Sequence, residues 1–351
     1  MDLNEEARPF AGAAARWALG LLLAAVLSVG PTMTAARAAL PTVVPVGRAV
    51  GIKLFSDGVV VVGTSEIATE AGSVNPAKDC GLKEGDIITH INSTEVDTIE
   101  EVSALLQELE GEAMSIRAIR DDKQVQLTAT AALCSADGAY KLGAWIRDSM
   151  AGIGTVTFYC PDTGAFGALG HGINDVDTAL LMPLDSGSIL PATVAGVEKG
   201  RAGDPGQLQG VFDTDSTLGL LRANTSGGVF GVMADSSWVE GSPVEAAARE
   251  AVRPGEAAIL CNVSGDQVEE YAVRIEKVFP QREDDCRDYL IKVTDPRLLE
   301  ATGGIVQGMS GSPILQDGRL VGAVTHVLVD DPTSGYGIWV GRMLQQCEHK
   351  E

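Results

Sequence analysis

The segment from residue 304 to 315, GIVQGMSGSPIL, contains the serine whose surroundings best suit nucleophilic chemistry. Ser310 has a glycine two residues before it and another directly after it, and such residues let a side chain stand exposed in a tight turn. Clusters of Gly, Ser and Pro are also ordinary loop residues between strands. A serine acts as a nucleophile only beside a base, an orienting acid and donors for an oxyanion, so the rest of the chain has to supply these groups.

Histidine is the usual base in such a site, and the chain has four of them. His349 lies in a polar end segment, QQCEHKE, and His90 and His326 lie in segments that alternate as strands do. His171 lies in FGALGHGIND, where glycines on both sides let the backbone turn and expose the ring. We therefore predict that His171 is the base that serves Ser310.

The orienting acid is not decided by the residues alone. Several aspartates lie between the predicted base and the predicted nucleophile, and nothing in their local sequence separates them. The candidates include Asp175, Asp177, Asp213, Asp215, Asp284, Asp285, Asp288 and Asp295.

The composition bounds the class of protein. The 351 residues suffice for two or three domains, and a hydrophobic content of 45% supports a packed core. A net charge of -22 disfavours binding to the phosphates of a nucleic acid. The six cysteines show no CxxC and no histidine-paired spacing, so no metal site is predicted.

The first 40 residues are expected to be a targeting segment. Residues 17–29, WALGLLLAAVLSV, form an uncharged apolar run shorter than the about 20 residues of a membrane-spanning helix. Arg8 and Arg16 precede this run, and residues 36–38, ARA, have the spacing of a signal-peptide cleavage site. We predict export, with residues 1–40 acting either as a cleaved signal peptide or as a retained membrane anchor.

Residues 45–132 are predicted to contain short strands and one amphipathic helix. The string GLKEGDII (81–88) enters a predicted strand, and TIEEVSALLQELEG (98–111) predicts an amphipathic helix with Thr98 and Glu101 in a capping box. These features resemble PDZ domains, which bind peptide tails as an added strand and hold the terminal carboxylate in a backbone loop. By the bacterial PDZ pattern, that loop consists of Gly51, Ile52, Lys53 and Leu54.

The rest of the chain is predicted to be all-β. After a linker over residues 133–147, short apolar segments alternate with glycine-containing turns through residues 148–345, and a polar tail follows at 346–351. GMSGSP (308–313) is similar to the serine loop of chymotrypsin-like proteases, which implies a double β-barrel. The resemblance implies that the backbone N–H groups of Gly308 and Ser310 face the oxyanion. Thr325 and His326 fall in the following strand, where that family binds its substrate, so His326 is expected to be a substrate-cleft or a structural residue.

Three stretches together resemble one narrower family. They are the PDZ region, VTFYCPDTGAFGALGHGI, and TGGIVQGMSGSPILQDGRLVGAVTHVLVDDPTSGYGIWV. Over about residues 45–345 the chain is similar to the stage IV sporulation protein B family, the serine peptidases of endospore-forming bacteria. The resemblance implies a triad of His171, Asp295 and Ser310, with the aspartate in KVTDPRLL as the acid, and it implies no metal or organic cofactor.

The resemblance also implies a role in signalling. Such a peptidase cleaves the extracytoplasmic part of a membrane regulator in the space between forespore and mother cell membranes. That cleavage activates sigma-factor processing, and the enzyme also cleaves itself. The expected partners are this protein substrate and peptide tails at the PDZ domain. Two alternatives stay open, namely a general envelope quality-control PDZ protease, in which the PDZ domains follow the protease, and a non-catalytic peptide-binding scaffold.

Overall fold

The computed structural model describes residues 41–280 and 286–348. The predicted signal peptide or anchor at residues 1–40, the candidate acids Asp284 and Asp285, and the last residues of the predicted polar tail lie outside the described residues. Strands contain 53% of the residues and helices 11%, which confirms the prediction of a mainly β chain. No helix within the described ranges is both long and apolar enough to cross a membrane.

The first barrel of the peptidase part is a ring of six strands. In order around the ring they are β2 (Ala49–Thr64), β11 (Ala144–Tyr159), β12 (Ala165–Ala168), β16 (Gly228–Met233), β15 (Gly219–Thr225) and β13 (Ser186–Glu198). Each strand pairs with the next, and β13 pairs with β2 to close the ring. Alternate side chains point inward, so that Val156, Phe166 and Ile189 are fully buried in one cluster.

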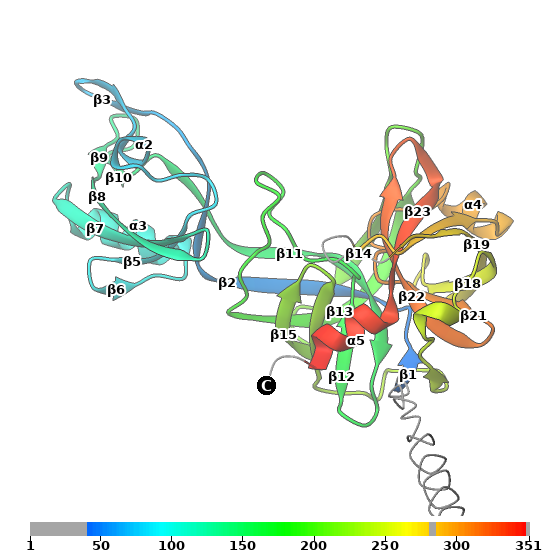
Figure 1. Cartoon of the computed structure of the whole chain (residues 1–351). Coiled ribbons are helices and arrows are strands. Elements are labelled where there is room, and N and C mark those ends of the chain that lie inside the picture. Colours follow the sequence, from blue (N-terminus) through cyan, green and yellow to red (C-terminus); the bar gives the residue numbers. More distant parts are fainter. Residues whose placement is uncertain (1–40, 281–285, 349–351) are drawn as a thin grey trace, which may run out of the picture. The chain divides into compact units, whose positions relative to one another are not determined.

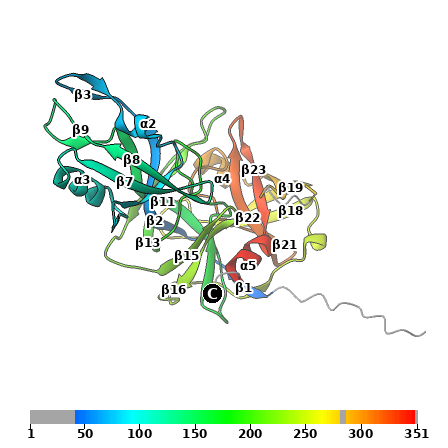
Figure 2. The same cartoon turned by 60° about the vertical axis from the view of Figure 1, so that its left-hand side comes forward.

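Three short strands extend this sheet: β1 (Thr42–Pro45), β14 (Gln207–Phe212) and β17 (Val244–Glu245). The second barrel closes in the order β18-β19-β20-β23-β22-β21 (Figures 1 and 2). Its strands are β18 (Gly255–Cys261), β19 (Glu269–Val278), β20 (Tyr289–Val293), β21 (Pro313–Gln316), β22 (Arg319–Leu328) and β23 (Asp331–Trp339). The two barrels confirm the predicted double β-barrel.

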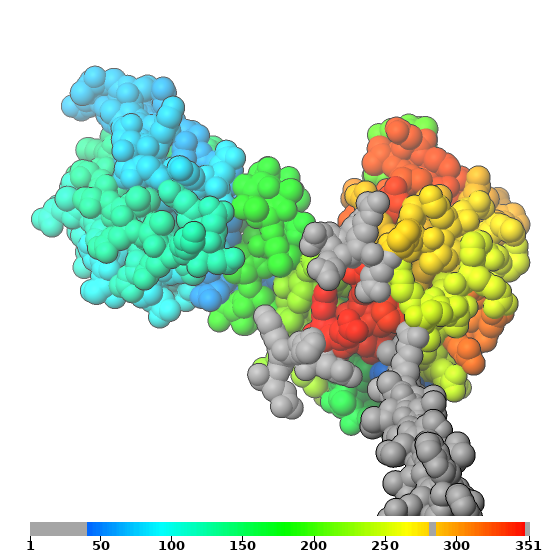
Figure 3. All heavy atoms as spheres, in the orientation of Figure 1, coloured from blue at the N-terminus to red at the C-terminus, as the bar shows by residue number. Residues whose placement is uncertain are grey.

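Short helices join and cover the second barrel. A 3-10 turn, η1 (Arg249–Ala251), precedes β18, and α4 (Pro296–Thr302) follows β20. The last helix, α5 (Val340–Glu348), lies on the outer surface in Figure 3 and contacts β12, β16, β22 and β23. Its buried Met343 and Leu344 belong to the barrel core, so the predicted polar tail from residue 346 begins inside a helix.

The PDZ domain is inserted into the hairpin that β2 and β11 form. Its elements are β3 (Ile67–Thr69), β4 (Gly72–Val74), α2 (Pro76–Cys80), β5 (Ile87–Ile91), β6 (Thr94–Glu95), α3 (Ile99–Glu108), β7 (Ala113–Arg120), β8 (Lys123–Thr130), β9 (Ala132–Leu133) and β10 (Tyr140–Lys141). The strands β2 and β11 run out of the barrel and into the PDZ sheet, where β2 pairs with β5 (Figure 1). The predicted capping box of Thr98 and Glu101 begins α3.

The insertion changes the domain boundaries expected from the sequence. Val50, Ile52 and Leu54 pack in the barrel with Val156, so the peptidase begins before the PDZ domain and resumes after it. Residues 133–147 are not a linker, because they contain the β9–β10 hairpin and the start of β11. The pairing of β2 with β11 cannot be predicted from local sequence, because the two strands are separated by the whole PDZ domain. In the sequence, a long buried strand such as β2 also looks like several short strands.

Candidate active site

Ser310 lies in the loop of residues 303–312, between α4 and β21. Gly308 and Gly311 have φ values of 95° and 98°, which side-chain-bearing residues rarely adopt. A Cβ atom at Gly311 would lie 2.0 Å from the carbonyl oxygen of Thr155, so only glycine fits there. Thr155 on β11 holds the loop, because its Oγ1 donates to Gly308 O at 2.8 Å and its N–H donates to Ser310 O at 3.0 Å.

Of the two serines in this loop, Ser310 faces a pocket. Ser312 is fully buried, whereas Ser310 is partly exposed and lines the pocket wall. The Ser310 hydroxyl donates a hydrogen bond to the carbonyl oxygen of Thr325 at 2.7 Å. Its oxygen therefore keeps its lone pairs available to a reacting group, and a base near it could take the proton.

His171 lies in the loop between β12 and β13, directly after Gly170, whose φ is 72°. Its Nδ1 lies 2.8 Å from the carbonyl oxygen of Gly172. Because a carbonyl oxygen only accepts, Nδ1 carries the proton, and Nε2 is left with a lone pair. Burial lowers the pKa of His171 below its ordinary value, although the Gly172 contact opposes this effect. The ring is therefore neutral at neutral pH and suited to accept a proton.

The structure brings His171 and Ser310 to one pocket of about 290 Å³. The pocket lies where the two barrels meet, since its walls come from β2, β11, the His171 loop and the Ser310 loop. The lining residues are Ile52, Met150, Ala151, Gly152, Ile153, Leu169, His171, Gly172, Ile173, Asn174, Gln307, Gly308 and Ser310. A largely apolar cleft with two reactive side chains at its wall can receive a peptide and react with it.

The predicted oxyanion donors are Gly308 and Ser310. Neither backbone N–H donates to an acceptor within the described part of the chain, although the neighbouring Met309, Gly311 and Ser312 N–H groups all do. Two uncommitted N–H groups beside a nucleophile are the arrangement that stabilises the negative oxygen of a tetrahedral intermediate.

The predicted substrate-binding residues lie beside the pocket. Thr325 is buried on β22, and its carbonyl oxygen is the acceptor for the Ser310 hydroxyl. The His326 ring centroid lies 4.9 Å from that of His171, with the two rings tilted by 37°. Neither residue lines the pocket itself, so a contact of these residues with substrate stays a prediction.

Asp295 has a different place from the one predicted. It is the N-cap of α4, where it accepts from Arg297 N at 2.9 Å and from Ala272 N at 3.2 Å, and the Arg297 guanidinium pairs with it at 3.0 Å. Bonds from Arg297 and from the Ala272 N–H lower the pKa of Asp295 to about 2. Among the described residues, no carboxylate is hydrogen-bonded or ion-paired to His171, whose ring has the Gly172 carbonyl as a hydrogen-bond partner and lies beside the His326 ring.

The structure therefore does not bring Asp295 to His171. The physical reason is local, because an aspartate followed by proline is a strong helix start that uses the carboxylate as a cap. Four of the other described candidate acids are engaged elsewhere: Asp175 and Asp177 pair with Arg147, Asp213 accepts from Ser216, and Asp288 pairs with Arg249 and Arg342. Asp215 lies in the same turn as Asp213, whose carboxylate accepts from the Asp215 N–H. The hydrogen-bond partner of the His171 ring is instead the backbone carbonyl of Gly172.

The predicted PDZ carboxylate loop, Gly51, Ile52, Lys53 and Leu54, is not a loop. These residues lie inside β2 and pair with β11 on one edge and with β13 on the other. No peptide strand can add where both edges are paired. Ile52 lines the catalytic pocket instead, so this segment belongs to the peptidase.

A second pocket, of about 410 Å³, lies inside the PDZ domain. It is lined by the α3 side chains Val102, Ser103 and Leu106 and by residues 140–146. Over residues 144–147, β11 pairs with β2 along one edge, and within the described residues no strand pairs with its other edge. A helix facing an open strand edge is the arrangement in which PDZ domains add a peptide strand.

Sequence reasoning missed the contribution of β11. Residues 150–153 wall the catalytic pocket, and Thr155 holds the serine loop in place. No motif marks these positions, because their role depends on β11 passing beneath two loops that are remote from it in sequence.

Comparison with known proteins gives family matches for both parts. Residues 138–344 match the family described as SpoIVB peptidase S55, and residues 71–120 match the PDZ domain family. No curated protein matches the chain significantly. Two solved structures are similar. The PDZ domain of the SdrC-like protein from Listeria monocytogenes is 23% identical, with coverage of 26% of this chain and 87% of its own and a TM-score of 0.21. The active form of the Rv3671c protease from M. tuberculosis is 16% identical, with coverage of 58% and 77% and a TM-score of 0.32.

Proposed function

The chain belongs to the SpoIVB peptidase S55 family and is a serine endopeptidase with a PDZ domain, and from this premise we propose that Ser310 and His171 carry the hydrolysis. One observation carries the proposal. The two side chains, remote in sequence, line the same pocket, and His171 holds the tautomer whose Nε2 accepts a proton. Ser312 is buried and does not compete for the role of nucleophile.

In the acylation step, the Ser310 hydroxyl turns from Thr325 O toward His171. The oxygen Oγ attacks the peptide carbonyl carbon while Nε2 of His171 takes the hydroxyl proton. The carbonyl oxygen becomes negative and accepts from the N–H groups of Gly308 and Ser310. When the carbon–nitrogen bond breaks, Nε2 returns the proton to the leaving amine, and an acyl-serine remains.

Deacylation repeats these steps with water. Nε2 takes a proton from the attacking water, and the Ser310 oxygen leaves and recovers that proton. Throughout the cycle Nδ1–H donates to Gly172 O, which holds the ring orientation and stabilises the imidazolium less than a carboxylate would. Burial disfavours the imidazolium further, so the site suits a base that is protonated only transiently during the reaction.

A fluorophosphonate probe on the purified protein tests the assignment. We expect covalent labelling of the wild type and of Ser312→Ala, and none of Ser310→Ala. His171→Ala should label orders of magnitude more slowly, because loss of a nucleophile or its base costs that much. Equal labelling of Ser310→Ala and the wild type would overturn the assignment, and a wild type that never labels would favour a peptide-binding scaffold.

For the natural substrate, we propose the extracytoplasmic region of a membrane regulator whose cleavage activates sigma-factor processing during sporulation. Membership of the family supports this proposal, and so does a PDZ domain built into the peptidase. The proposal includes self-cleavage. It also places the enzyme in the space between forespore and mother cell membranes, with residues 1–40 as signal or anchor.

The substrate proposal is tested by mapping new protein termini in sporulating cells that carry either the wild type or Ser310→Ala. We expect few serine-dependent cuts, in one membrane protein and in the peptidase itself. Many cuts spread over unfolded envelope proteins would indicate a quality-control protease instead.

The PDZ pocket between α3 and the open edge of β11 is proposed to bind peptide tails. Ser103→Trp would fill this pocket from the exposed face of α3, whereas Ser103→Ala leaves it open. Fluorescent peptides that end in valine with a free carboxylate should bind the wild type and Ser103→Ala, and should lose affinity for Ser103→Trp. Equal binding by all three proteins would contradict the proposal.

A further inference from the structure

The segment that follows His171 folds as a closed loop, which we call the base loop (residues 171–182). Asn174 and Leu181 form an antiparallel bridge across it. At its tip, Oδ1 of Asp175 accepts from the N–H groups of Asp177 and Thr178, at 3.1 and 2.9 Å, and from the Thr178 hydroxyl at 3.0 Å. One carboxylate oxygen is thus used within the loop, and Oδ2 is left for a partner outside it.

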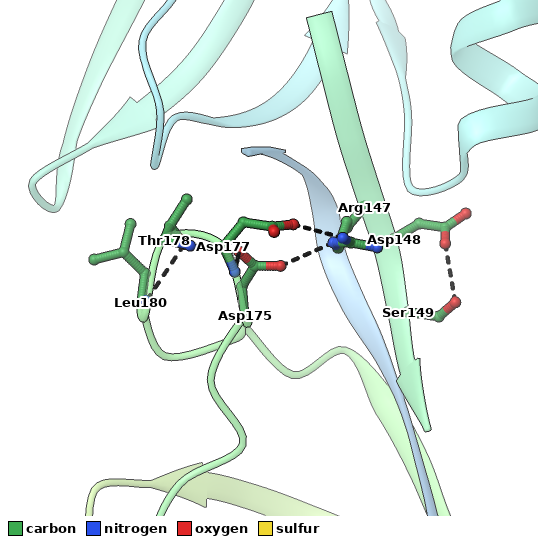
Figure 4. A network of polar contacts seen from close by, with 7 residues as sticks. All are labelled: Arg147, Asp148, Ser149, Asp175, Asp177, Thr178 and Leu180. Atoms are coloured by element: carbon green, nitrogen blue, oxygen red, sulfur yellow. Dashed lines mark hydrogen bonds and ion pairs between the residues drawn. The ribbon is translucent and has the colours of Figure 1, made fainter. Parts of the chain in front are cut away.

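That partner is Arg147 on β11 (Figure 4). Its Nε lies 3.0 Å from Oδ2 of Asp175, and its second guanidinium nitrogen lies 2.5 Å from Oδ2 of Asp177. The Asp175 side chain is 0% exposed, whereas Arg147 is 40% exposed. Burial opposes ionisation of Asp175, but its hydrogen bonds and Arg147 outweigh this, so its pKa is lowered. Among the described residues Arg147 is the one cation paired with this buried carboxylate, so the ion pair ties the loop to β11.

The base loop has a second anchor on the barrel side. The Asn224 amide accepts from Ile173 N at 2.8 Å and donates to Ile173 O and Met182 O at 2.9 Å each. The loop is therefore held at its two ends by Asn224 and at its tip by Arg147. Without Arg147 the tip would have no ionic contact with β11.

These contacts bear on catalysis because, among the described residues, no carboxylate is paired with His171. The ring takes its orientation from the Gly172 carbonyl, so the backbone of the base loop decides where Nε2 points. Arg147 stands three residues before Met150, where β11 begins to form the opposite pocket wall. A single strand thus sets the pocket wall and, through Arg147, the position of the base loop.

We propose that Arg147 is a positioning residue for His171: by pairing with Asp175 and Asp177 it holds the base loop against β11, so that the imidazole faces Ser310. The inference rests on the proposed function, since it assigns a role in the reaction of that same site. Arg147 lies too far along β11 to be part of the pocket lining, and it acts on the reaction only through the loop.

Fluorophosphonate labelling kinetics of the full chain test this role, with the maximal labelling rate and the half-saturating probe concentration measured separately. We expect Arg147→Gln to lower the maximal rate about tenfold or more and to leave the half-saturating concentration within about twofold. Arg147→Lys should recover part of the rate, because an ammonium pairs as a point charge and cannot engage both carboxylates as a guanidinium does.

The matched control is Arg274→Gln, which removes another half-exposed arginine that pairs with a surface carboxylate, Glu256, remote from the pocket. It should label at the wild-type rate. Because Arg147→Gln leaves a buried charge unpaired, the double variant Arg147→Gln/Asp175→Asn is also needed. If the two residues act as one unit, the double variant labels no more slowly than Arg147→Gln alone.

Folded Arg147→Gln and double variants that label within about twofold of the wild-type rate would overturn the inference. A change in the half-saturating concentration alone would also overturn it, because it would show Arg147 to bind the probe. A wild type that is not labelled would refute the proposed function instead, so the two failures are distinct.

Discussion

Replacing Asp295 with asparagine and with alanine separates two roles for this residue. As the N-cap of α4, Asp295 stabilises the helix that leads into the Ser310 loop. As the acid of a triad, it would hold the tautomer of His171. Asparagine is as good a cap as aspartate, but it cannot replace a triad carboxylate. Alanine fails in both roles.

The structure sets the size of the expected effect on stability. The fall of the Asp295 pKa from 3.8 to about 2 corresponds to about 2 kcal/mol of unfolding free energy at neutral pH. Arg297 is 58% exposed, so solvent screening reduces this to about 1 kcal/mol. Loss of the cap adds about 1 kcal/mol. We therefore expect Asp295→Asn to lose about 1 kcal/mol and Asp295→Ala about 2 kcal/mol.

The pH dependence of this stability has a defined sign. Because the pKa of Asp295 is lower in the folded protein, its contribution is full above the unfolded value of about 4 and is lost as the pH falls through about 2. Urea unfolding at pH 7 and at pH 3 should show the difference between wild type and Asp295→Asn shrinking at the lower pH.

Fluorophosphonate labelling of the same variants decides the catalytic question. We expect Asp295→Asn to react within about threefold of the wild-type rate at a temperature where both are folded. A triad acid would lower the rate by about four orders of magnitude on the same substitution. A stable Asp295→Asn protein with that loss would refute our reasoning and would place Asp295 against His171 in the reacting enzyme.

Further predictions concern His171, the serine loop and Thr155, which holds that loop. Because burial lowers the pKa of His171, the acid limb of the rate profile should lie below the ordinary histidine pKa of about 6.5, and a limb above that value would contradict the described burial. Gly311→Ala should lower the labelling rate at least about 100-fold, because its Cβ would collide with Thr155 O. The control Gly318→Ala has a φ of 74° and open space around it, so it should lower the stability by only about 1 kcal/mol and leave the labelling rate unchanged. Thr155→Val, which removes the hydroxyl bond to Gly308 O, should lower the labelling rate with little change in probe affinity, and unchanged kinetics would show that the bond is dispensable.

The candidate nucleophile and the candidate base could be proposed from the sequence because both lie in recognisable local patterns. Gly308 and Gly311 around Ser310, and the glycines around His171, mark turns that expose a reactive side chain, and both residues do line one pocket. The capping box of α3 and the many short strands are likewise local, since they follow from the spacing of a few residues. Such patterns can be recognised in a sequence without knowing which residues pack against them.

The arrangement of strands required the tertiary structure. The residues of β2 belong to the peptidase barrel because β2 pairs with β11 and β13, and the chain between β2 and β11 forms a whole PDZ domain. A segment such as Gly51 to Leu54 has the same local sequence whether it forms a peptide-binding loop or a doubly paired strand. Only its neighbours in space decide between these, and they are remote in the chain.

The partners of the candidate acids Asp295 and Asp175 were likewise decided by the tertiary structure. In the sequence, Asp295 and Asp175 are both aspartates between His171 and Ser310. In the structure, the proline after Asp295 commits its carboxylate to a helix cap, and Arg147 from β11 holds the carboxylate of Asp175. A carboxylate binds whichever donor the packing places within hydrogen-bond distance. The sequence shows that an aspartate is present, but only the tertiary structure shows which donor it binds.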